Sequence, residues 1–149
     1  MLMLAQATEA ATDSVFDDIG GAIGWTLVSF GLFAIGFVVM DLLTPGHLRT
    51  QVRDNLNAAV LVAAKMLAVA VIVFVAVWTA PDELGDGVVH AGGLGLVALA
   101  FSVVAFLGLD RLIPGGIRHL LDEPRFSPMV VVAGAAEISV ALTAAVALS

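Results

Sequence analysis

The sequence predicts an all-α integral membrane protein with four transmembrane helices, built as two tandem, parallel helix-loop-helix repeats. Hydrophobic residues make up 60% of the 149 positions and charged residues 13%, whereas soluble domains have about 45–50% and about 25%. Four apolar stretches are each long enough to cross a bilayer, and two loops carry the same motif. With a mean hydropathy of +1.07, the outer surface must be apolar as well as the core, and lipid is the solvent that accepts it.

The composition also excludes several classes of function. The chain has no cysteine, so disulfides and thiolate chemistry are excluded. Six Lys and Arg residues are too few to displace the counterions of a nucleic acid. No nucleophile stands near a base, so we predict no enzyme and no catalytic residue. His47, His90 and His119 lie in different loops without metal-ligand spacing, so we predict neither a metal site nor a cofactor.

The predicted helices cover residues 21–43, 57–80, 88–109 and 127–148. Each reaches the ~20 residues that a helix needs to cross a ~30 Å hydrocarbon core. Ser127 and Pro128 are typical of a helix start, as an N-cap hydroxyl followed by a proline in the first turn. The transmembrane domain is therefore expected over 21–149, with one repeat over about 21–80 and the other over about 88–149.

Residues 1–20 are expected to form an acidic N-terminal arm. They contain four acids and no Lys or Arg, whereas a secretory signal begins with cations and continues with about 7–15 apolar residues. We therefore interpret this segment as an exposed or interfacial arm that stays on the mature chain.

The distribution of cations predicts how the chain is oriented. Five arginines lie in the two longer loops, whereas residues 1–20 and 81–87 contain seven acids and no Lys or Arg. Because loops rich in Lys and Arg stay in the cytoplasm, both longer loops are expected inside and both termini outside. Trp25 and Trp78 then lie together at the outer interface, where indole rings are enriched.

A shift of 69 positions superposes the two longer loops without a gap. The recurring motif consists of Asp41, Pro45, Gly46 and Arg49 in one loop and of Asp110, Pro114, Gly115 and Arg118 in the other. Two spans return a chain to its starting side, so the repeats run parallel. An acid at a helix C-terminus opposes the helix dipole. We therefore expect the two aspartates to orient their loops, with the arginines compensating; a partner or cation site is the alternative.

The loop around Thr44-Pro45 and the entry to the second helix, Asn55-Leu56-Asn57-Ala58-Ala59, carry a family resemblance. With the duplicated two-span plan, they resemble the domain-of-unknown-function-350 family, the YjfL-like bacterial inner-membrane proteins. The resemblance implies a small multi-pass protein of the bacterial cytoplasmic membrane, often encoded beside envelope-stress or ATP-grasp genes. It supplies no catalytic residue. The second half lacks this asparagine motif, so a role that depends on Asn55 and Asn57 belongs to one half.

Lys65 and Glu137 are charges inside predicted spans, ~12 Å and ~15 Å from the inner face. An ionised group there costs about 2.5–3.5 kcal/mol, and such groups usually face the bundle interior and pair. One interpretation is a structural ion pair, or a Lys65 that reaches the surface while Glu137 stays protonated. A second makes Glu137 a protonation site on an ion or proton path that Lys65 controls. A third places the pair across a homo-oligomer interface.

Two hypotheses about function follow. The leading one is a non-enzymatic membrane component or adaptor that presents its arginine-bearing cytoplasmic loops to a cytoplasmic or membrane protein partner or to anionic lipid. The resemblance adds an envelope-stress setting. The alternative is a small homo-oligomeric channel or transporter for ions or protons that uses Glu137 and Lys65.

Overall fold

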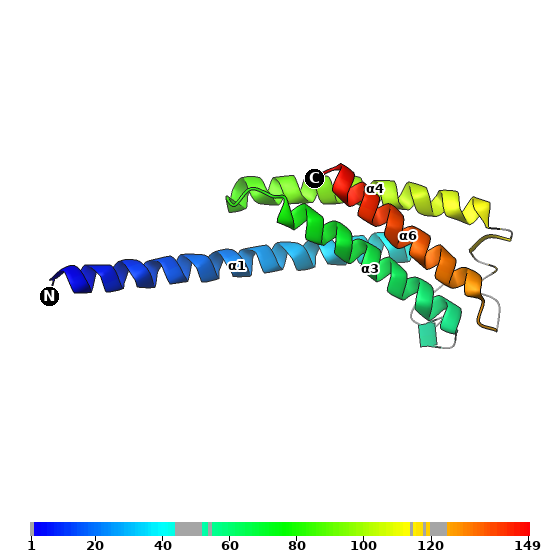
Figure 1. The fold of residues 1–149 in the computed structure, drawn as a ribbon, viewed down its shortest axis with the longest axis horizontal. Helices are drawn as coiled ribbons and strands as arrows, with labels where there is room; N and C mark the ends of the chain where they lie inside the picture. Colours follow the sequence, from blue (N-terminus) through cyan, green and yellow to red (C-terminus); the bar gives the residue numbers. More distant parts are fainter. Residues whose placement is uncertain (1, 44–51, 54, 114, 118, 120–124) are drawn as a thin grey trace.

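The computed structural model of the chain is a bundle of four long helices (Figure 1). It describes residues 2–43, 52–53, 55–113, 115–117, 119 and 125–149. The helices are α1 (Leu2–Leu43), α3 (Leu56–Trp78), α4 (Leu84–Leu112) and α6 (Pro128–Ala147). No strand occurs among the described residues. The all-α fold class is therefore confirmed.

All four helices contain a stretch that is long and apolar enough to cross a membrane. In α3, α4 and α6 this stretch is the whole helix, and in α1 it covers Asp18–Val39. The limits of α3, α4 and α6 lie about one helical turn or less from the predicted ones. The prediction of a multi-pass membrane protein with four spans is confirmed.

Helix α1 begins much earlier than the sequence suggested. It runs from Leu2 to Leu43 without a break, so the boundary expected at residue 21 is not a helix boundary. Its 42 residues correspond to about 63 Å, roughly twice the hydrocarbon thickness. Figure 1 shows its N-terminal part extending past the other helices. Acidic residues end an apolar stretch but not a helix, because a helix continues readily into water. That residues 1–20 form an exposed arm stays a prediction.

The helices that follow one another in the chain run antiparallel (Figure 1), and α3 has the most extensive contacts with the others. It packs against α1, α4 and α6, and its contact with α6 is the most extensive in the bundle. One buried cluster surrounds Val69 and Ile72 of α3, and a second joins Leu61 of α3 to Phe106 of α4 and Val130 of α6. The tandem-repeat relation between the halves stays a prediction.

Small residues allow α3 and α6 to approach closely. A Cβ atom added to Gly134 would lie 2.8 Å from the Cβ of Ala64. On α1, a Cβ added to Gly36 would lie 2.6 Å from Val69 Cγ1. Such close approaches are how helices associate in lipid, where burial of apolar surface gives no preference for a partner helix. In contrast, a Cβ added to Gly92 would meet nothing within 4 Å.

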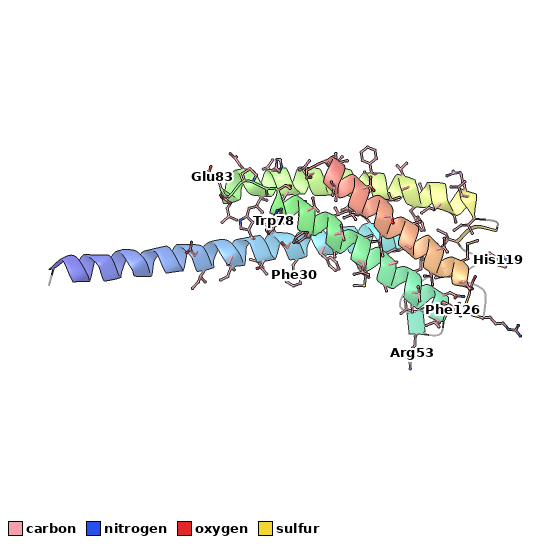
Figure 2. The ribbon with its side chains drawn as sticks, viewed as in Figure 1. Phe30, Arg53, Trp78, Glu83, His119 and Phe126 are labelled. Carbon is pink, nitrogen blue, oxygen red and sulfur yellow. The ribbon has the colours of Figure 1, made fainter. Side chains whose placement is uncertain are left out.

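The two ends of the bundle differ in composition. Figure 2 shows Trp78 and Glu83 at one end and Arg53, His119 and Phe126 at the other. We call the first the tryptophan end and the second the arginine end. The extension of α1 projects from the tryptophan end (Figure 1).

Candidate functional site

Two asparagines organise the start of α3 at the arginine end. Asn55 is the N-cap, and its Oδ1 accepts a hydrogen bond of 2.8 Å from the backbone N–H of Asn57. Asn57 is buried and bridges to the segment that precedes α6. Its Nδ2 donates to the carbonyl of Arg125 at 2.9 Å, and its Oδ1 accepts from the N–H of Ser127 at 3.0 Å. One side chain therefore ties two segments that lie 68 residues apart in sequence.

Ser127 stands at the N-cap of α6 and Pro128 in its first turn, as the sequence predicts. The Ser127 side chain makes no capping hydrogen bond in the described structure. Asn57 instead binds the backbone N–H of Ser127. The expected hydroxyl cap is therefore wrong, although the helix start is right.

Asp110 folds the loop after α4. Its Oδ1 accepts a hydrogen bond of 2.8 Å from the N–H of Ile117, which is buried. Gly115 and Gly116 between them have φ values of 86° and 74°, a backbone conformation that glycine adopts readily and other residues rarely do. The side chain of Asp110 therefore contacts the backbone of its own loop seven residues further on; that it orients the loop stays a prediction.

The other members of the loop motif are only partly described. Asp41 is exposed at the end of α1. Five further members of the motif lie outside the described residues. They are Pro45, Gly46 and Arg49 in the first loop and Pro114 and Arg118 in the second. The expectation that arginines compensate the two aspartates therefore stays a prediction.

The two intramembrane charges meet in the middle of the bundle. Lys65 of α3 donates a hydrogen bond of 2.9 Å from Nζ to Oε1 of Glu137 on α6, and their side chains are 4% and 2% exposed. The pair lies close to the Ala64–Gly134 approach, one residue away on α3 and three residues away on α6. An ion pair in such surroundings offsets the desolvation of both charges only when its geometry is good.

An aromatic ring completes the surroundings of the lysine. Lys65 Nζ lies 3.3 Å from the centroid of the Phe106 ring on α4, where the negative face of the ring attracts a cation. Ser102, one turn before Phe106, is also buried. Among the described residues, neither Ser102 Oγ nor Glu137 Oε2 has a hydrogen-bond partner. Three helices therefore contribute to one sealed polar cluster in an apolar core.

This cluster is chemically limited. Neither of the two large grooves on the described surface is lined by Lys65 or Glu137. In the part of the chain that the structure describes, no three His, Asp or Glu side chains are placed to hold a metal ion. The arrangement joins α3, α4 and α6 through one ion pair and one cation–ring contact.

Sequence reasoning singled out Lys65, Glu137, Asn55 and Asn57, but it missed three of their partners. Phe106 was missed because a phenylalanine in an apolar helix looks like any lipid-facing residue. The partners of Asn57 were missed because they are backbone groups of Arg125 and Ser127. The signal was an asparagine at a helix start, since a buried amide must find several hydrogen-bond partners.

Four apolar helices, a buried ion pair and two polar ends define a small multi-pass membrane protein. The family model described as Domain of Unknown Function (DUF350) matches residues 14–148. The chain belongs to this family.

Similar proteins from bacteria are named as transmembrane proteins. The UPF0719 transmembrane protein of Mycolicibacterium paratuberculosis (strain ATCC BAA-968 / K-10) is 32% identical over 127 residues, which cover 82% of this chain and 84% of that protein. UPF0719 transmembrane proteins of Mycobacterium bovis and Mycobacterium tuberculosis are each 33% identical over 125 residues, covering 83% of this chain and 82% of theirs. No solved structure matches the chain.

Proposed function

We propose that the chain is a non-enzymatic membrane component that binds a protein partner through its arginine end. The observation that carries this proposal is the Asn57 bridge. It holds the segment with Arg125 and Phe126 against the start of α3, close in sequence to Arg53. All three of these side chains are exposed, so the bridge fixes a surface that faces outward.

This surface has the composition of a protein-binding site. Exposed arginines stand close in sequence to exposed large apolar side chains, which include Val52, Leu56, Phe126 and Met129. Arginine and aromatic residues are enriched at protein interfaces and among the residues that dominate binding energy. Within the described residues, Arg53, Arg111 and Arg125 have no carboxylate partner. No described carboxylate therefore neutralises their charges.

The charge balance favours a protein over anionic lipid. Residues 41–56 and 110–127 together contain five arginines and five acids. Attraction to anionic lipid is about 1 kcal/mol for each Lys or Arg near the surface, and the neighbouring acids oppose it. A fixed pattern of positive and negative charges suits a protein partner whose charges form the complementary pattern. The envelope-stress setting rests on the family resemblance alone.

Photo-crosslinking in the membranes of the source cells tests the proposal. A photoreactive benzoyl-phenylalanine replaces either Phe126 or Val131 in the full chain; both native side chains are 49% exposed, but Val131 lies within the α6 span. We expect one discrete protein adduct from position 126 and none from 131. Arg53→Gln with Arg125→Gln should remove the adduct while leaving the amount of folded chain unchanged.

Adducts to lipid alone at position 126, or the same protein adduct from both positions, would overturn the proposal. A channel lined by Lys65 and Glu137 is the competing function. It has less support because both side chains are buried and line neither described groove.

A further inference from the structure

A large groove lies between α1 and α3 at the tryptophan end. It encloses about 770 Å³, within the ~300–1,000 Å³ of small-molecule sites. Figure 2 shows Phe30 of α1 and Trp78 of α3 in this region, with Glu83 beyond them at the same end. The residues that give the groove its chemistry are Trp25, Phe30, Phe33, Phe74, Trp78 and Asp82.

Both walls of the groove are aromatic, but their side chains differ in exposure. On α3, the Phe74 and Trp78 rings are stacked with centroids 5.8 Å apart and an interplanar angle of 24°. Trp78 is 78% exposed and Phe30 69%, so their surfaces are free to contact a ligand. On α1, Trp25 packs closely on α4, because a Cβ added to Gly87 would lie 2.6 Å from Trp25 Cη2. Trp25 is therefore held against α4, whereas Phe30 on the same wall and Trp78 on the other are accessible.

The charged residues at the tryptophan end, where the groove lies, are all acidic. Asp82 is exposed and lines it. Within the described residues, Asp82 has no cationic partner. Residues 1–20 and 81–87 contain no Lys or Arg, so a phosphate-bearing headgroup would find acids and no counter-charge. A cation would find the Asp82 carboxylate and aromatic faces that attract positive charge.

We propose that this groove binds an amphiphilic organic cation, with one positive charge, an apolar aryl or alkyl body and no phosphate. The apolar body lies between α1 and α3 against the aromatic walls, and the charge lies beside Asp82. This proposal is independent of the partner surface, which lies at the opposite end of the bundle. Charge complementarity selects the free cation over the two other occupants of a lipid-facing groove, a phospholipid chain and a second copy of α1.

The chain reports occupancy of the groove by itself, because its two tryptophans both line it. The full chain in nanodiscs is titrated with tetraphenylphosphonium while tryptophan fluorescence is recorded, and empty nanodiscs correct for partition into lipid. We expect saturable quenching. Asp82→Asn should weaken binding about fivefold at low salt, the upper range for an exposed charge pair. Asp86→Asn is the matched control, an acid at the same end that does not line the groove, and it should leave affinity unchanged.

Tetraphenylborate, which has the same shape and the opposite charge, should quench weakly and without saturation. Quenching by both probes to the same extent would overturn the proposal in favour of a lipid-chain groove. Quenching that is unaffected by Asp82→Asn would overturn it as well. A titration that responds only in nanodiscs loaded with a single copy of the chain would show that a second copy fills the groove, which also contradicts the proposal. Because Asp82 is exposed, its variant is expected to fold, and a salt dependence of wild-type binding checks the charge term independently.

Discussion

Helices α1 and α3 are both apolar enough to span a membrane, yet they relate to the bundle in different ways. In the most apolar stretch of α1, 11% of the residues are buried, against 44% in α3. Helix α3 pairs with α6 through Lys65 and Glu137 and through Ala64 and Gly134. Helix α1 turns large side chains such as Phe30 outward. Hydropathy therefore identifies a span, whereas polar and small residues determine which spans pair.

The physical reason lies in the solvent. Lipid tails are as apolar as leucine, so two membrane helices gain little by burying leucines against each other. Close backbone approach and interhelical hydrogen bonds distinguish one partner from another. The α3–α6 contact has both, and the α1 contacts rely on single close approaches such as that of Gly36. Four variants test this difference.

The largest effect is expected from Glu137→Gln. It removes the countercharge of a buried lysine, and breaking such a pair costs about 3 kcal/mol or more of unfolding free energy. Lys65→Met together with Glu137→Gln should lose less, because no unpaired charge remains. Denaturant titration in mixed micelles measures both, and equal losses in the single and double variants would remove the case for a stabilising pair.

Gly134→Ala should come next. The added methyl group would lie 2.8 Å from Ala64 Cβ, so α6 must move away from α3 at a cost of about 1–3 kcal/mol. Gly92→Ala is the control on α4, where a Cβ meets open space and alanine favours the helix by up to about 1 kcal/mol. Thermal unfolding should shift in opposite directions for the two variants; shifts in the same direction would contradict the packing account.

Asn57→Ala is expected to act locally at the arginine end. The loss leaves the Arg125 carbonyl and the Ser127 N–H without their described partner, at about 1 kcal/mol for each of these partly buried groups. Hydrogen exchange should accelerate around residues 125–128 while the centre of α3 stays protected. Uniform acceleration along α3 and α6 would show that Asn57 supports the whole bundle and not one segment.

The smallest effect is expected from Leu27→Ala on α1. Leu27 is exposed in the single chain, so stability should change by no more than about 0.5 kcal/mol. Size-exclusion chromatography in a mild detergent should give the same elution volume for the variant and the wild type. A large loss of stability or a change in oligomeric state would mean that a second copy covers this face of α1.

The sequence predicted the spans well because a bilayer sets their minimum length and composition. It misplaced the start of α1, since residues such as Asp13 mark where the apolar stretch ends and not where the helix ends. The charges of Lys65 and Glu137 were visible because so few occur inside spans. The groove was not predicted, because Trp25 and Asp82 come together only through the packing of α1 on α3 and the turn after it.

The most direct test of the central claim, that the Lys65–Glu137 pair stabilises the bundle and lines no path, is a flux measurement. Liposomes containing the purified chain are assayed for proton and ion flux beside empty liposomes and beside the double variant Lys65→Met with Glu137→Gln. The account predicts the same background flux in all three. Flux above that of empty liposomes, abolished in the correctly folded double variant, would contradict it and establish the pair as part of a conduction path.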